Sequence, residues 1–239
     1  GCHAVPMDRH MPDYGNRDLP FIERKNYRKI CYFLGVMLNA RGERFVDEGE
    51  NFRNYTYAQF GRAILEQPGS FAWQVFDEKV AALLYDEYRF EHASIVAADT
   101  LEELVRLLLD VAAAAALRTL QQFNAAVDDS APFDPTSLDG RCTQGLALNK
   151  TNWANRLDTP PYRAYPVTCG ITFTYAGVKI DPSAAVLDKT GQPIPGLYAC
   201  GEMVGGIFCD GYPGGSGLTS GAVFGRMAGH SAATSAASG

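Results

Sequence analysis

The stretches that decide the fold lie near the C-terminal end: GLYACGE at residues 196–202 and GYPGGSGLTSGAVFGR at residues 211–226. The first is predicted to be a short apolar strand that runs into a carboxylate, Glu202. The second is a glycine-dense loop that leads into a helix of small residues. Glycines let a backbone approach a flat ligand without Cβ clashes, and a helix N-terminus directs free N–H groups and partial positive charge at it. These stretches therefore predict a binding site for a flat ligand.

The carboxylate and the glycine loop together resemble the ring-side half of a flavin site. Glu202 can accept hydrogen bonds from ribose or ribityl hydroxyls. The other half of such a site is a glycine-rich strand–turn–helix, G-x-G-x-x-G, which holds the pyrophosphate. No such motif occurs in the 239 residues. We therefore expect a missing N-terminal FAD-binding half to supply the pyrophosphate site.

Composition excludes several classes of protein. The chain is 46% hydrophobic with a formal net charge of −6, which gives no support for nucleic-acid binding. The six cysteines are scattered without a CxxC pair, a pattern typical of reduced cytosolic thiols rather than a disulfide framework or a zinc site. We expect no metal site and a cytoplasmic location, with any membrane association made through a partner.

The first two-thirds of the sequence predicts alternating strands and helices. Apolar residues 32–39, a turn at 40–43 and residues 44–46 predict a hairpin. Residues 57–67 have helical character, and residues 71–76 predict a buried strand. Capping residues predict three further helices: one after Asp77 to residue 85, one from Thr100 to 109, and one from Asp110 to about 127.

The last third of the sequence predicts loops, short strands and a final helix. Residues 128–165 are rich in proline and predict loops. Residues 170–175 and 177–180 predict strands, and residues 185–194 predict a hairpin around a DKTG turn. A buried strand at 197–200 and a helix at 218–233 complete the prediction.

Three motifs resemble the FAD-dependent succinate dehydrogenase and fumarate reductase flavoprotein superfamily. They are the pair Gly201-Glu202 with FGR at 224–226, GERFVDE at 42–48, and TYAG at 174–177. Within the superfamily, EGENFRNYTY at 48–57 and PVTCGITFT at 166–174 resemble tricarballylate dehydrogenases and the related flavoprotein that makes precorrin-3B.

The resemblance implies an α+β fold: a capping domain of the fumarate reductase flavoprotein type joined to the C-terminal part of a Rossmann-like FAD-binding domain. Residues 1–35 would form the junction into the cap, residues 36–165 the capping domain, and residues 166–239 the FAD-domain part. FAD is implied for the full-length protein. The chain by itself is expected to lack FAD and to be inactive.

The resemblance also implies roles for individual residues. Glu202, Gly201, Gly217, Leu218 and Thr219 would bind the cofactor, the last three through backbone N–H groups at the flavin ring. His3, Thr172 and Arg53 would bind substrate carboxylates, and Glu48 with Arg53 would relay a proton. For His3 the alternative is a loop histidine, and for Glu48 and Arg53 it is a surface ion pair.

The sequence departs from the reductases at three aligned positions. Ala81 replaces their catalytic arginine, Thr172 a substrate histidine, and Tyr212 an arginine of the glycine-rich loop. Plain fumarate reduction is therefore disfavoured. A tyrosine before Pro-Gly also occurs in 3-ketosteroid dehydrogenases, so Tyr212 is either a catalytic phenol or an aromatic lid on the flavin.

The resemblance, together with these departures, implies an FAD-dependent dehydrogenase that oxidises a small polycarboxylate, of the tricarballylate to cis-aconitate type. Its electrons would pass to a membrane or iron–sulfur acceptor protein. A precorrin-3B-forming flavoprotein is one alternative, and a catalytically inactive capping-domain fragment is another.

Overall fold

The computed structural model describes residues 2–6, 28–90, 93–171, 174–209 and 211–237. The chain divides into two compact units, residues 2–170 and residues 171–239 with Gly1. We call them the cap unit and the C-terminal unit. Each is described by itself.

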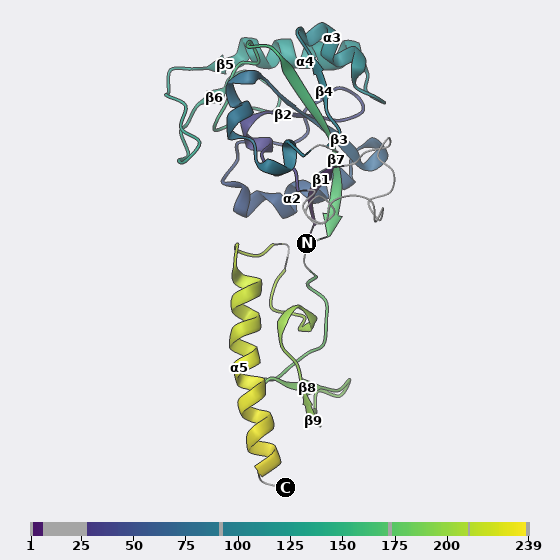
Figure 1. The fold of residues 1–239 in the computed structure, drawn as a ribbon, viewed down its shortest axis with the longest axis vertical. Coiled ribbons are helices and arrows are strands. Elements are labelled where there is room, and N and C mark those ends of the chain that lie inside the picture. Colours follow the sequence, from purple (N-terminus) through teal and green to yellow (C-terminus); the bar gives the residue numbers. More distant parts are fainter. Residues whose placement is uncertain (1, 7–27, 91–92, 172–173, 210, 238–239) are drawn as a thin grey trace. The chain divides into compact units, whose positions relative to one another are not determined.

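The cap unit is built on a five-stranded sheet with the order β1-β7-β3-β2, and β4 also pairs with β7 (Figure 1). Its strands are β1 (Cys2–Pro6), β2 (Val36–Leu38), β3 (Phe71–Phe76), β4 (Val96–Ala98) and β7 (Tyr162–Ile171). The β2–β3, β3–β7 and β4–β7 pairs are antiparallel. The predicted strand at residues 71–76 is confirmed.

Both faces of this sheet are covered, which is why every residue of β3 is buried. Alternate residues of a strand point to opposite faces. On one face Trp73 and Val75 pack against Leu104 of α3 (Leu101–Leu107) and Phe123 of α4 (Ala113–Ala126). On the other face, residues of β2 and β3 pack against α2 (Arg53–Leu65). The core is therefore two layers divided by the sheet.

Helix starts follow the predicted caps in two of three cases. Thr100 caps α3 by accepting a hydrogen bond from the Glu103 amide at 3.1 Å. Asp77 caps a 3₁₀ helix, Glu78–Leu83, by accepting from the Lys79 amide. The prediction that Asp110 caps the next helix is wrong, because α4 begins at Ala113 after an uncapped Ala112.

Two further predictions in the cap unit, one of a strand and one of a loop, are also wrong. Residues 44–46 do not pair with β2, which instead pairs with β3 in the register Val36↔Val75. The hairpin pattern was local, whereas the partner that buries β2 is distant in sequence. Residues 162–165 belong to the strand β7, although the proline-rich range 128–165 predicted loops. Pro166 lies opposite Trp73 within that antiparallel pair.

The cap unit also contains a short ribbon. Its strands β5 (Val127–Asp128) and β6 (Cys142–Thr143) are antiparallel.

The C-terminal unit holds the antiparallel pair β8 (Ala185–Leu187) and β9 (Pro193–Tyr198) and the helix α5 (Ser216–Ala237). The DKTG hairpin is confirmed: Asp188 Oδ1 accepts hydrogen bonds from the amides of Thr190 and Gln192. The final helix is confirmed as well. The buried strand predicted at 197–200 is wrong in its burial, because Leu197 is exposed and only Ala199 is buried.

The buried hydrophobic cluster of the C-terminal unit is small. It consists of Val186, Ala199 and Val204, with Ile180 partly buried against it. No residue of α5 is buried. Among the described residues, no helix is long and apolar enough to cross a membrane.

Candidate functional site

The predicted site residues fall in two groups, one in each unit. Glu48 and Arg53 lie in the cap unit, whereas the residues predicted to bind the cofactor lie with Tyr212 in the C-terminal unit. His3 lies in β1, but its side chain is outside the described structure. Thr172 lies outside the described residues.

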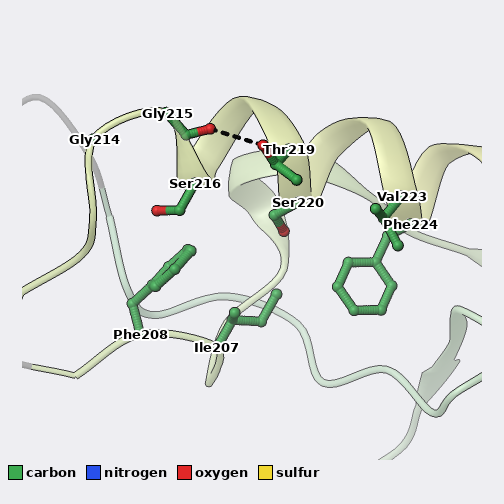
Figure 2. Close-up of a pocket in the computed structure, with 9 residues that line it drawn as sticks. All are labelled: Ile207, Phe208, Gly214, Gly215, Ser216, Thr219, Ser220, Val223 and Phe224. Atoms are coloured by element: carbon green, nitrogen blue, oxygen red, sulfur yellow. Dashed lines mark hydrogen bonds between the residues drawn. The ribbon is translucent and has the colours of Figure 1, made fainter.

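A pocket lies at the start of α5, with a cavity volume of about 480 Å³. Figure 2 shows its lining: the side chains of Ile207 and Phe208 face the first turns of α5, and the Phe224 ring extends from the helix. Gly214, Gly215 and Ser216 form its rim at the helix start. An apolar pocket that opens beside backbone amides suits a flat ring with polar edges.

The helix start that borders this pocket fixes the direction of its amides. The Gly215 carbonyl accepts from the Thr219 amide at 3.1 Å and from Thr219 Oγ1 at 3.2 Å. Gly215 has a φ of 84°, a conformation that glycine adopts readily. The amides of Gly217 and Leu218 belong to the first turn, where the helix offers them no carbonyl. Neither residue lines the pocket, but their amides can donate to an acceptor at the start of the helix.

Glu202 follows Gly201, whose φ of 78° turns the chain after β9. Glu202 Oε1 accepts hydrogen bonds from the Thr174 amide at 2.8 Å and from Thr174 Oγ1 at 3.2 Å. This oxygen therefore holds the TYAG segment. Within the described part of the chain, Oε2 takes no hydrogen bond, so it is the oxygen that can accept from a ligand hydroxyl.

Close backbone packing holds the same segment in place. The Val178 amide donates to the Met203 carbonyl at 2.9 Å, and the Gly205 amide donates to the Val178 carbonyl at 3.0 Å. A Cβ on Gly177 would lie 2.1 Å from the Met203 oxygen. Only glycine permits this approach, which explains the glycine of TYAG without a ligand.

Tyr212 belongs to an aromatic cluster. Its ring lies 6.0 Å from that of Tyr175 in an edge-on arrangement and 5.8 Å from that of Phe208. Phe208 also lines the pocket. Sequence reasoning singled out Tyr212 but missed the other two rings, because no spacing in the sequence links position 175 to position 212.

Glu48 is fully buried in the cap unit and is bound to Arg44. Its Oε2 lies 2.5 Å from Arg44 Nη2, and its Oε1 accepts from the Met37 amide at 2.8 Å. Arg44 also donates to the Leu148 carbonyl at 2.7 Å. The structure thus brings Glu48 together with Arg44 and β2, and it shows no hydrogen bond between the described side chains of Glu48 and Arg53.

Arg53 is half-buried at the first residue of α2, and its guanidinium carbon lies 4.5 Å from the centre of the Tyr85 ring. Four other described arginines are half-buried, and each forms an ion pair with a carboxylate. They are Arg44, Arg141, Arg156 and Arg163. Among the described residues, no carboxylate lies within ion-pair distance of Arg53. Its N–H edge is therefore available to an external anion.

Two buried lysines in the cap unit were not predicted. Lys150 Nζ donates to the carbonyls of Phe33 at 2.8 Å and Gly35 at 2.6 Å, and burial lowers its pKa to about 8. Burial likewise lowers the pKa of Lys29 to about 8, and Lys29 Nζ lies 5.0 Å from the Tyr88 ring centre. No sequence pattern signals either one, because the carbonyls that receive them are backbone atoms.

Comparison with known proteins agrees with these features. A family profile described as "FAD binding domain" matches residues 27–218. The chain is 32% identical over 199 residues, 83% of its length, to a probable fumarate reductase Ifc3 of Shewanella frigidimarina (strain NCIMB 400). It is 30% identical over 215 residues, again 83% of its length, to a 4-oxocyclohex-2-ene-1-carboxylate 5-dehydrogenase of Sinomonas cyclohexanicum.

A solved structure shares the fold. The open conformation of a flavocytochrome c3 fumarate reductase superposes with a TM-score of 0.64 at 28% identity, and the match covers 99% of this chain. The chain spans 31% of the Shewanella protein, 36% of the Sinomonas protein and 36% of the flavocytochrome chain. The mixed α and β fold and the motifs at both ends of the match agree: the chain belongs to the FAD binding domain family, among the fumarate reductase and succinate dehydrogenase flavoproteins.

Proposed function

We propose that the full-length protein is an FAD-dependent dehydrogenase that oxidises a small polycarboxylate, of the tricarballylate to cis-aconitate type. The observation that carries this proposal is Arg53. It is half-buried, lies 4.5 Å from the centre of the Tyr85 ring and has no carboxylate partner among the described residues. Arginine binds carboxylates through two parallel N–H groups, so an unpaired arginine in this state suits an anionic substrate.

The residues of the C-terminal unit fit the ring of FAD. The pocket beside α5 is apolar, two first-turn amides can donate to a ligand at the helix start, and Glu202 Oε2 can accept from a hydroxyl. Gly201, Gly217, Leu218 and Thr219 would hold the cofactor with Glu202. Bound FAD would supply the hydride acceptor. The helix N-terminus would favour negative charge at the ring edge that it faces.

Dehydrogenation rather than reduction is supported by Tyr212 and Ala81. Neither side chain can supply the positive charge of the arginines that reductases are expected to have at the aligned positions. A phenol can instead donate a hydrogen bond to charge that develops on an oxygen of the substrate, and it can accept a proton when ionised. We propose Tyr212 for this role, with His3, Thr172 and Arg53 as substrate contacts.

Glu48 has a narrower place in this proposal than the resemblance implies. Its buried pairing with Arg44 and the Met37 amide suits a carboxylate that holds the segment leading to α2. A proton relay through Glu48 and Arg53 requires the two side chains to meet during turnover. The pH profile of a Glu48→Gln variant tests this: loss of one ionisation would support the relay.

A second candidate is oxidation of a ring-shaped carboxylate. The cluster of Tyr175, Phe208 and Tyr212 offers aromatic faces against which a six-membered ring can pack. One relative is named for a cyclic oxo acid. A precorrin-3B-type substrate, a far larger ring, remains the third alternative.

The test is steady-state turnover by the full-length protein with an artificial electron acceptor. Tricarballylate and 4-oxocyclohexanecarboxylate are compared as substrates, and fumarate reduction is measured with a reduced dye. The proposal predicts the highest kcat/KM with tricarballylate and a loss of at least tenfold in Tyr212→Phe. Unchanged turnover in that variant would remove Tyr212 from the mechanism. Turnover of fumarate alone would contradict the proposal.

The proposal includes partners. The missing N-terminal half would complete the FAD site, and an iron–sulfur or membrane protein in contact with the cytoplasm would accept the electrons. The chain alone is proposed to be inactive, because it has residues for the ring side of the cofactor and no motif for the pyrophosphate.

A further inference from the structure

We propose that Tyr85 is a positioning residue that holds the Arg53 guanidinium through a cation–π contact and leaves N–H groups of Arg53 for one carboxylate of the substrate. This inference rests on the proposed function, in which Arg53 binds the substrate. It adds a residue that neither the motifs nor the family resemblance singles out.

Tyr85 is supported by a buried cluster of the cap unit. Tyr85 lies between two 3₁₀ helices, Glu78–Leu83 and Asp86–Tyr88, and its carbonyl accepts from the Tyr88 amide at 3.0 Å. Its neighbours Leu84 and Tyr88 are buried in one cluster with Phe76, and Tyr85 packs partly buried against that cluster. The Tyr88 ring is fixed in turn by Phe76 at 5.7 Å and Tyr165 at 4.9 Å. Tyr85 therefore packs against a cluster of buried, mutually fixed rings.

Arg53 occupies an electrostatically unfavourable position in α2. Arg53 is the first residue of α2, and no acidic residue lies in that first turn. A helix N-terminus carries partial positive charge, so a cation there is disfavoured and an anion is favoured. The arginine and the helix therefore repel each other but attract the same ligand. This arrangement favours anion binding over helix stability.

Arg53 and Tyr85 form a cation–π contact. The guanidinium carbon lies 4.5 Å from the Tyr85 ring centre, within the range of a cation–π contact. Arginine has five N–H donors, so a contact with one ring leaves several of them for hydrogen bonds. The ring also displaces water beside the guanidinium, which strengthens the attraction of an anion.

Arg53 interacts electrostatically with Cys31 and Tyr32. Burial raises the pKa of the Cys31 thiol to about 12 and raises the pKa of the Tyr32 phenol, and the charge of Arg53 lowers both only in part. Both groups are therefore neutral near pH 7. Glu50 acts on Tyr32 from a distance, and its carboxylate accepts a hydrogen bond from Gln59 at 3.3 Å. None of these groups neutralises Arg53 in place of a substrate.

The experiment measures KM and kcat of the full-length, FAD-loaded protein with tricarballylate. Tyr85→Leu removes the ring, and we expect KM to rise about three- to tenfold with a smaller change in kcat. Tyr85→Phe keeps the ring face and should keep KM within about twofold of the wild-type value. Tyr55→Leu is the matched control. Tyr55 lies on α2 with Arg53, and it is 68% exposed.

Arg53 variants separate this inference from the proposed function. Arg53→Ala should raise KM at least tenfold, and an unchanged KM would overturn the role of Arg53 and with it the proposed function. If Arg53→Ala raises KM while Tyr85→Leu matches the wild type, only the positioning role is overturned. Should Tyr85→Leu fail to fold, Tyr85→Met decides, because it keeps a long apolar side chain but has no ring face. A threefold or larger rise in KM then supports the role of Tyr85, and an unchanged KM contradicts it.

Discussion

The cap unit and the C-terminal unit differ in how much hydrophobic surface they bury. The cap unit buries three clusters of hydrophobic residues around its sheet and satisfies buried charges with partners of its own. The C-terminal unit has one small buried cluster, and large apolar residues such as Leu197, Leu218 and Val223 are exposed. Burial of apolar surface is the main force that holds a domain together.

The two units differ in whether local or long-range contacts specify their structure. In the C-terminal unit, turns and the helix are specified by local chemistry: Asp188 closes a hairpin and Gly215 opens α5. In the cap unit, long-range pairs dominate, such as β3 with β7. We infer that the cap unit is stable by itself, and that the C-terminal unit gains its stability from the partner half that we propose.

The largest expected effect tests the cap core. Phe76 is 1% exposed and packs edge-on against Tyr88 and Tyr165. Phe76→Ala should lower the free energy of unfolding of the cap unit by about 4 kcal/mol, because it leaves a cavity. Val186→Ala in the C-terminal unit should cost about 1 kcal/mol. Urea unfolding of the chain measures both, and equal losses would break the comparison.

The next effect tests the buried charge pair. Glu48→Gln leaves Arg44 without its carboxylate in a buried site, and we expect a loss of about 3 kcal/mol in the free energy of unfolding. The matched control is Glu43→Gln, because the Arg41–Glu43 pair is exposed on both sides. A loss below 1 kcal/mol for Glu48→Gln would show that the pair is not what holds this segment.

A third prediction concerns pH. The pKa of Lys150 is about 8 in the folded chain against 10.5 for an ordinary lysine. Between these values the unfolded chain binds more protons, so this lysine makes stability rise with pH. From pH 7 to pH 10 the wild type should gain about 2 kcal/mol relative to Lys150→Met. Parallel urea titrations of the two chains at both pH values check this, and a constant difference would contradict the lowered pKa.

The smallest effect tests α5. Gly229 has nothing within 4 Å of an added Cβ and lies inside the helix. Gly229→Ala should stabilise α5 by roughly 0.5–1 kcal/mol, because alanine is the better helix former. Gly49→Ala is the opposite case, since its Cβ would lie 2.2 Å from the Asn152 oxygen. Helix content by circular dichroism should rise in the first variant, and thermal stability should fall in the second.

Much of the fold was predictable where the determining chemistry is local. The caps Asp77 and Thr100, the DKTG hairpin and the last helix depend on neighbours in sequence, and the strand at residues 71–76 is a continuous apolar run. The pairing of β2 and the length of β7 depend on a partner strand more than 30 residues away, so no local pattern specified them.

The site divides in the same way. Gly201, Glu202 and the start of α5 were recognisable because their motif is contiguous. The Arg44 partner of Glu48 was visible in GERFVDE but was not assigned, and the Tyr85 partner of Arg53 is 32 positions along the chain. The buried Lys150 was beyond prediction, because backbone carbonyls receive it. Side-chain partners brought together by the tertiary fold are what the sequence could not supply.

The central claim is that this chain carries the ring side of an FAD site and depends on another half for the cofactor. The most direct measurement is the absorbance spectrum of the purified 239-residue chain, recorded near 450 nm after incubation with excess FAD and removal of the unbound flavin. The account predicts a colourless protein with far less than one flavin per chain. A yellow preparation with one flavin per chain would contradict it.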